Sequence, residues 1–269
     1  MSDTDPILLE IQEGVALVRL NRPEALNALS TPLVVALRDT LCDLRRNNDV
    51  RVLLLTGEGR AFCSGADLND PIMSQDAPRL ERGRSFKLVM DGQMNGLLRD
   101  LYNFDRPKIA AVNGLAVGGG AGVALAMDMV FAAESAYFMQ VFAPNLNLVP
   151  DLGCTWHLGR NLGRARAIGL AMTGYRLSAK KAEDWGLIWQ SVPDAQLATL
   201  AFETAKSLAN GPIAALSAVP KIMDAAVLNS LDDQLNIERD VQSALVQTKD
   251  FEEALIAFSE KRLPKFTGQ

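Results

Sequence analysis

The stretch that decides the fold runs from residue 113 to residue 122 and reads Asn-Gly-Leu-Ala-Val-Gly-Gly-Gly-Ala-Gly. Residues 109–112 before it are apolar, as in a buried strand, and residues 123–127 after it are typical of a buried helix. A glycine run between strand and helix leaves backbone N–H groups unshielded at the positive end of a helix dipole. A group that develops negative charge can approach such donors closely, although the same glycines can serve only close packing of helix on strand.

A second unit of this kind lies earlier in the chain. The apolar run at 52–55 is typical of a buried strand, and small residues follow at 63–66 in the order Cys-Ser-Gly-Ala. If the strands at 52–55 and 109–112 are neighbours, both turns open at the same edge and two backbone N–H groups can converge. Two convergent donors form an oxyanion hole for a carbonyl oxygen, and loss of one donor typically costs about 2.7–4 kcal/mol in the transition state.

The alternation of strands and helices over most of the chain predicts an α/β fold with helices outside the sheet. Periodicity and turn signals predict strands at 7–11, 15–20, 52–55, 109–112, 129–133, 136–139 and 187–192, helices at 31–47, 83–104, 123–127 and 179–186, short helices after 153, and a loop at 69–82. From residue 194 onward the sequence is nearly all helix. We therefore expect residues 1–193 to form the core and residues 194–269 a helical oligomerisation region.

Composition excludes several classes of function. The chain has 269 residues and a net charge of −5, which does not suggest a nucleic-acid partner. Three cysteines without a CxxC pair fit a reducing compartment, and the single histidine, His157, excludes a histidine-rich metal cluster. Neither a Walker loop nor a dinucleotide turn is present, so we expect no metal and no redox cofactor. We find no targeting segment and no apolar run that spans a membrane, and expect a cytoplasmic protein.

Several motifs in a fixed order resemble the crotonase (enoyl-CoA hydratase/isomerase) superfamily. They lie at residues 21–29 (Asn-Arg-Pro-Glu-Ala-Leu-Asn-Ala-Leu), 59–68 (Gly-Arg-Ala-Phe-Cys-Ser-Gly-Ala-Asp-Leu), 112–120, 172–187 and 258–262, and the likeness spans residues 7–266. The resemblance implies a ββα spiral core with a C-terminal α-helical trimerisation region. It also implies an acyl-CoA thioester as substrate, with coenzyme A entering only as part of that substrate, and a homotrimer or hexamer.

The resemblance also assigns roles to individual residues by motif position. The backbone N–H groups of Ala66 and Gly119 are implied to hold the thioester oxygen while an enolate forms. The residues implied to line the nucleotide and pantetheine path are Ala25, Leu26, Ser64, Asp67 and Leu68. Phe258 and Lys261 are implied to reach the CoA phosphates from a neighbouring subunit.

The sequence departs from the family where a hydratase carries its two glutamates. The first position is Gly122, and the second falls at Phe142 or Ala143, in a segment (135–150) that contains no Glu or Asp. Addition of water to a double bond needs water activation and proton delivery, ordinarily by positioned carboxyl groups. Plain hydratase chemistry is therefore disfavoured.

One carboxylate remains well placed, Asp151 in the segment Val-Pro-Asp-Leu-Gly at 149–153. This segment resembles the Val-Pro-Asp-x-Gly of the phenylacetate-pathway isomerases, which act on ring-epoxide CoA thioesters and move enoyl-CoA double bonds. A single base near an oxyanion hole is sufficient for double-bond migration, so our leading interpretation is a CoA-thioester isomerase with Asp151 as the proton shuttle.

Other interpretations of Asp151 and of the whole chain stay open at this point. Asp151 can simply cap a helix that begins at Leu152. It can also act as a nucleophile on an aromatic ring carbon, as in acyl-CoA dehalogenases of the same superfamily, and the chain can be a non-catalytic CoA-binding subunit. His157 is interpreted as structural, because no Gly-x-Ser-x-Gly elbow exists for it to serve.

Overall fold

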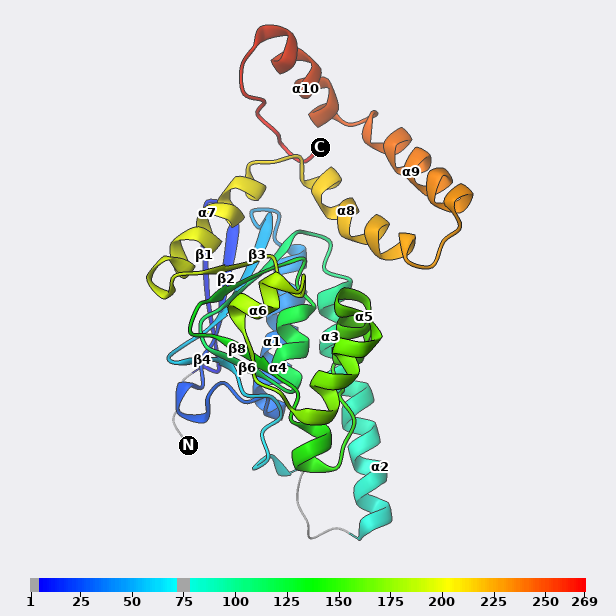
Figure 1. Ribbon diagram of the computed structural model, residues 1–269. Coiled ribbons are helices and arrows are strands. Elements are labelled where there is room, and N and C mark those ends of the chain that lie inside the picture. Colours follow the sequence, from blue (N-terminus) through cyan, green and yellow to red (C-terminus); the bar gives the residue numbers. More distant parts are fainter. Residues whose placement is uncertain (1–4, 72–77) are drawn as a thin grey trace.

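The computed structural model of the chain describes residues 5–71 and 78–269, and these fold around two sheets (Figure 1). The larger sheet has the strand order β1-β2-β3-β5-β7-β10, and the smaller sheet has the order β4-β6-β8-β9. The strands are β1 (Ile7–Gln12), β2 (Val15–Leu20), β3 (Val52–Gly57), β4 (Ala61–Cys63), β5 (Lys108–Val112), β6 (Leu115–Val117), β7 (Met129–Ala133), β8 (Tyr137–Met139), β9 (Leu177–Ser178) and β10 (Gln190–Val192). The expected α/β class is confirmed.

The larger sheet begins with an antiparallel hairpin, β1–β2, and continues with parallel strands through β10. Its inner strands are buried on both faces, which explains why they are continuous apolar runs without alternation. Strands β3 and β5 are direct neighbours, with Leu54 opposite Ile109. The strands predicted at 52–55 and 109–112 are therefore neighbours, as the predicted convergence of the two turns required.

Of the smaller sheet, the sequence analysis predicted only β8, as the strand at 136–139, and missed β4, β6 and β9. Strands β4, β6 and β8 have three residues each, and β9 has two, so none is long enough to show a period. The chain passes from β3 to β4, from β5 to β6 and from β7 to β8, each time from the larger to the smaller sheet. Both glycine turns therefore follow strands of the smaller sheet, β4 and β6, and do not follow β3 and β5 directly.

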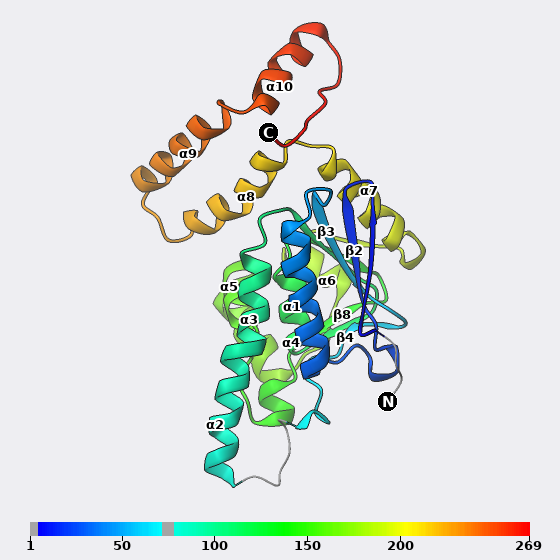
Figure 2. The same ribbon diagram turned by 180° about the vertical axis from the view of Figure 1, so that it is seen from behind.

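Helices pack on the two sheets or extend away from them, and Figure 2 shows α1 and α3 side by side. They are α1 (Thr31–Arg46), α2 (Arg79–Val89), α3 (Asn95–Tyr102), α4 (Gly119–Leu125), α5 (Cys154–Thr173), α6 (Ala179–Asp184), α7 (Leu197–Ala209), α8 (Ile213–Ala226), α9 (Leu231–Leu245) and α10 (Lys249–Glu260). A π-helical turn at Met90–Met94 joins α2 to α3. None of the described helices is long and apolar enough to cross a membrane.

Several boundaries differ from the prediction; helix α4, for example, begins at Gly119 and not at residue 123. Helix α2 begins at Arg79, so the expected loop ends earlier, and residues 72–77 of that loop lie outside the described residues. After residue 153 the chain forms one long helix, α5, which is kinked at Gly163. The last strand is shorter than expected, because Leu187 and Ile188 are buried without pairing in the sheet.

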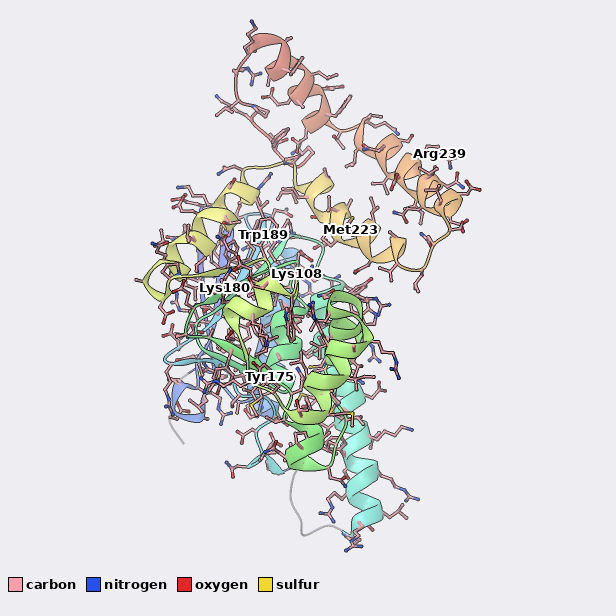
Figure 3. The ribbon with its side chains drawn as sticks, viewed as in Figure 1. Lys108, Tyr175, Lys180, Trp189, Met223 and Arg239 are labelled. Carbon is pink, nitrogen blue, oxygen red and sulfur yellow. The ribbon has the colours of Figure 1, made fainter. Side chains whose placement is uncertain are left out.

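Helix α7 packs on the larger sheet through small residues four positions apart, Ala201, Ala205 and Ala209. The chain leaves the sheet only afterwards, and α8, α9 and α10 form an arm at one end of the core (Figure 1). In Figure 3, Arg239 on α9 lies well outside the core, and Met223 on α8 lies between it and Lys108 of β5. Helix α7 therefore covers the sheet of the core, although it lies after residue 194, where the helical region was expected to begin. The division of the chain into domains stays a prediction.

Candidate active site

The two glycine turns lie against each other at one edge of the smaller sheet. Strand β4 pairs in parallel with β6, with Ala61 opposite Leu115, so both strands end at the same edge. A side chain at Gly65 would lie 3.3 Å from the Gly119 nitrogen and 2.8 Å from the Val117 carbonyl oxygen. Gly65 also has a φ of +93°, which side chains rarely adopt. Glycine is therefore required at residue 65 for the turns to touch.

The N–H of Ala66 is turned away from the neighbouring segment. Ala66 forms a parallel bridge with Leu29, in which the Leu29 N–H donates to the Gly65 carbonyl (2.7 Å) and the Asp67 N–H donates to the Leu29 carbonyl (3.2 Å). In a parallel bridge these flanking groups make the bonds, so the N–H of the central residue faces the other way. The Ala66 N–H is thus available to a ligand.

Gly119 presents its N–H at the first position of α4. The residue before it, Gly118, has φ 55° and ψ −124°, a conformation that favours glycine. The Gly118 carbonyl accepts hydrogen bonds from the N–H groups of Ala121 (3.0 Å) and Gly122 (3.3 Å). The Gly119 N–H has no acceptor within the helix, as is usual in a first turn. Ala66 and Gly119 therefore offer two main-chain donors on adjacent turns.

Asp151 lies half-buried just before α5, and its Oδ1 has no hydrogen-bond partner among the described residues. Burial raises the pKa of the Asp151 carboxyl from 3.8 to about 6, against a smaller lowering by its own backbone N–H. The helix begins at Cys154, and its N-cap is Gly153, with no side-chain cap. The interpretation of Asp151 as a helix cap is therefore wrong, because the αL glycine occupies that position.

The segment that carries Asp151 contacts the first turn of α4. A side-chain carbon at Gly119 would collide with Cδ1 of Leu152, the residue after Asp151. One at Gly122 would fall far inside van der Waals distance of the Leu152 carbonyl oxygen and 3.0 Å from its Cβ. Asp151, whose carboxyl group has the raised pKa, is thus the neighbour in sequence of Leu152, which packs on the glycine turn.

The contact between Leu152 and Gly122 also matters for catalysis, because residue 122 is where a hydratase carries the first of its two glutamates. Because the Leu152 backbone fills the space beside Gly122, no glutamate fits there without displacing that segment. At the second position Phe142 is buried and apolar, and Ala143 is exposed. The described chain therefore holds no carboxyl pair at the two positions where a hydratase of this family carries it.

The structure brings together most of the residues expected along the CoA path. The Ser64 N–H donates to the Leu26 carbonyl (3.0 Å), and its Oγ lies 3.5 Å from the Ala25 carbonyl oxygen. The Asp67 carboxylate is occupied by an ion pair with Arg22 (2.9 Å) and by the Asn69 N–H, which donates to its Oδ1 (3.0 Å). Leu68 is exposed beside it.

Phe258 and Lys261 lie elsewhere in a single chain. Both belong to the end of α10, on the arm, where Phe258 is 87% exposed and Lys261 caps the helix with a φ of +55°. The structure of one chain does not bring them to the glycine turns. Contact with CoA bound to a second subunit stays a prediction.

Sequence analysis missed Asn27, which holds the candidate site together. Its side chain is fully buried, and its Nδ2 donates to the carbonyl oxygens of Ala61 (2.8 Å) and Glu58 (3.0 Å). Its Oδ1 accepts from the Arg22 N–H (2.8 Å). Asn27 therefore ties the 22–29 loop to the turn before β4. The sequence did contain a signal for Asn27. Its φ is 56°, and asparagine adopts a positive φ more often than most other residues do.

His157 is part of the packing around α5. Burial, with a smaller contribution from Arg160, lowers its pKa from 6.5 to about 4, so it is neutral near pH 7. Its ring meets the edge of Trp156 with centroids 4.8 Å apart. Both residues also line a cavity of about 540 Å³ between the core and α8, away from the glycine turns. In the described ranges, no three His, Cys, Asp or Glu side chains are grouped as metal ligands.

Comparison with known proteins gives a consistent result over the whole chain. Residues 10–269 match the family enoyl-CoA hydratase/isomerase. The chain is 43% identical to 1,2-epoxyphenylacetyl-CoA isomerase of Escherichia coli K12 and 43% identical to a "probable enoyl-CoA hydratase" of Rhodobacter capsulatus, each over 98% of both chains. The crystal structure of an enoyl-CoA hydratase from Bacillus anthracis superposes with a TM-score of 0.89 at 31% identity, covering 98% of this chain and 100% of that one.

Proposed function

Because the chain belongs to the enoyl-CoA hydratase/isomerase family, we propose that it is an acyl-CoA thioester isomerase that moves a double bond, or isomerises a ring epoxide, with one aspartate. The observation that carries the proposal is the Asp151 carboxylate, half-buried with a raised pKa and an unpartnered oxygen beside the glycine turns. A pKa near the working pH suits a group that must both take and return a proton.

In the proposed mechanism the thioester oxygen accepts hydrogen bonds from the N–H groups of Ala66 and Gly119. These donors stabilise the negative charge that develops as a proton leaves the carbon chain. Ionised Asp151 takes that proton from one carbon and returns it to another, so the carboxylate is regenerated and no net proton is consumed. Charge stabilisation and proton transfer both come from the chain's own groups, so the reaction needs no metal or redox cofactor.

Isomerase is favoured over hydratase by packing at residue 122. The backbone of Leu152 occupies the place of the first hydratase glutamate, and the second position also has no carboxyl group. The relatives alone do not separate the two activities, since an isomerase and a hydratase are equally similar in sequence. A nucleophilic Asp151, as in dehalogenases, is the second candidate, because its Oδ1 is free of partners among the described residues.

Proton exchange tests this function directly. In deuterium oxide, a 3-enoyl-CoA should isomerise and take up deuterium at the exchanging carbons, and mass spectrometry of the product measures both. Because only ionised Asp151 is a base, kcat should rise with pH through about 6 and level off above it. No isomerised product from any enoyl-CoA, together with solvent oxygen-18 found in the Asp151 side chain after turnover of an aryl-CoA, would replace proton shuttling by the nucleophilic mechanism.

We also propose a homotrimer or hexamer assembled through the arm, with Phe258 and Lys261 of one subunit reaching CoA bound to another, and the cytoplasm as the compartment. The support is a set of exposed apolar side chains, on α8, α9 and α10 and in the connection between α8 and α9, that one chain leaves uncovered. These include Val219, Met223, Val227, Leu228, Leu231, Leu235, Leu255, Ile256 and Phe258. A face of this extent is typical of a protein interface.

The oligomer has a simple measurement. Sedimentation at micromolar concentration should give three or six times the chain mass of 29.1 kDa. Leu228→Asp should lower that mass, because a charge replaces an apolar side chain at the interface, whereas Leu80→Asp on α2, also exposed (70% against 80%) but outside the arm, should not. A compact monomer for the parent protein would contradict the assembly and the contact of Lys261 with a second subunit.

A further inference from the structure

The peptide between Gly118 and Gly119 has two ends with different tasks. Its N–H belongs to Gly119 and is one of the two proposed oxyanion donors. Its carbonyl, on Gly118, accepts hydrogen bonds from the first turn of α4 and also from the thiol of Cys154, with Sγ 3.4 Å from the oxygen. The donor for the substrate is therefore held, at the opposite end of the same amide, by a buried cysteine.

The surroundings of Cys154 keep its thiol protonated. Burial raises its pKa to about 12, with a smaller raising contribution from the nearby charge of Asp151. The Gln140 side chain donates to the sulfur, and Gln140 is itself 3% exposed with an Oε1 that has no partner in the described chain. Because a thiolate is needed for nucleophilic or metal-binding chemistry, this cysteine is available only as a hydrogen-bond donor.

We propose that Cys154 is a positioning residue for the oxyanion hole: its S–H orients and polarises the Gly118–Gly119 peptide so that the Gly119 N–H meets the thioester oxygen. This inference rests on the function proposed above. A hydrogen bond accepted by an amide carbonyl strengthens the hydrogen bond donated by the same amide, by about 10–30%. Cys154 also lies only three residues after Asp151 in the chain. It therefore connects the oxyanion hole to the segment that carries the proton shuttle.

The kinetic effect follows from these magnitudes. Losing a whole oxyanion donor costs about 10²–10³ in kcat, so weakening one donor by about 10–30% should cost about 2- to 8-fold. Cys154→Ala should therefore lower kcat by about 2- to 8-fold with little change in KM, because the interaction strengthens only as charge develops. Cys154→Ser restores an O–H donor and should recover most of the rate, and Cys42→Ser, an exposed cysteine on α1, should change nothing.

An infrared measurement separates this proposal from the proposed function. A saturated acyl-CoA such as hexanoyl-CoA, carbon-13 labelled at the thioester carbonyl, cannot isomerise but can sit in the hole. Bound to the parent protein, its carbonyl band should move to lower frequency; the shift should be smaller with Cys154→Ala and be restored with Cys154→Ser. No shift in the parent protein would contradict the oxyanion hole itself and, with it, both proposals.

Two results would overturn the role of Cys154 alone. One is an unchanged carbonyl shift and kcat in Cys154→Ala. The other is equal loss of both in Cys154→Ala and Cys154→Ser together with equally lowered melting temperatures, which indicates a packing role. If the parent shows the shift but forms no isomerised product from any enoyl-CoA, the isomerase function fails, whereas the Cys154 proposal is still decided by the infrared comparison. Should the alanine variant not fold, Cys154→Val, which fills the space of the thiol without a hydrogen-bond donor, is compared with the parent protein and with Cys154→Ser in its place.

Discussion

Asp151→Asn is expected to lose about 10²–10⁴-fold in isomerase turnover, because a positioned general base typically contributes that much. The amide is nearly the same size as the carboxylate but cannot take up and return a proton near neutral pH. The variant should still fold and bind acyl-CoA. Deuterium exchange and turnover of an enoyl-CoA measure the loss, and calorimetric titration with a saturated acyl-CoA measures the binding.

The same substitution should stabilise the folded protein near neutral pH. The folded-state pKa of Asp151 is about 6, against an ordinary 3.8, so the folded protein binds the proton more tightly than the unfolded chain does. Stability contributed by this group is present at low pH and is lost as pH rises from about 4 to about 6. Removing the ionised carboxylate should therefore gain about 1–3 kcal/mol at pH 8 and little at pH 4, as measured by thermal unfolding.

Glu134→Gln is the matched control, since Glu134 is an exposed carboxylate at the end of β7. It should change neither turnover nor stability by a measurable amount. Near-normal turnover of Asp151→Asn would mean that the proton shuttle is another group. A loss of stability at pH 8 would mean that the carboxylate has a stabilising partner when folded.

Gly122→Ala is expected to be strongly harmful, although alanine is normally the better helix former. Its Cβ collides with the Leu152 backbone, which must move, and overpacking of this kind costs about 1–3 kcal/mol. Leu152 is bonded to Asp151, so the proton shuttle shifts as well, and misplacement by about 1 Å can cost about 10²-fold in rate. Thermal unfolding and turnover of the same enoyl-CoA measure the two effects.

Gly159→Ala provides the comparison for that variant. Gly159 is an exposed glycine of α5, and a side-chain carbon added there would meet no neighbouring atom within 4 Å. Alanine at this position should therefore stabilise the protein by about 0.5–1 kcal/mol without affecting turnover. Gly122→Glu should fail in the same way as Gly122→Ala and acquire no hydratase activity. A well-folded Gly122→Glu that hydrates an enoyl-CoA would show that Leu152 yields easily and would remove the packing reason for preferring an isomerase.

The inner strands of the larger sheet could be predicted because a strand buried on both faces is a continuous run of apolar residues. The run at 52–55 became β3 and the run at 109–112 became β5, and both are long enough to be recognised as apolar segments. Strands β4 and β6 could not be predicted in this way. Each is a three-residue segment stabilised by its neighbours in the smaller sheet, and such pairing depends on residues far away in the chain.

By itself the sequence determined the α/β class, the family resemblance, and the absence of both hydratase glutamates, since each depends on local patterns or on residue identity. Only the tertiary structure decided that β4 ends beside β6, that Gly153 and not Asp151 caps α5, that the Leu152 backbone occupies the space beside Gly122, and that the Cys154 thiol bonds the Gly118 carbonyl. The raised pKa of Asp151 belongs to the second group, because burial is produced by segments that meet only when the chain folds.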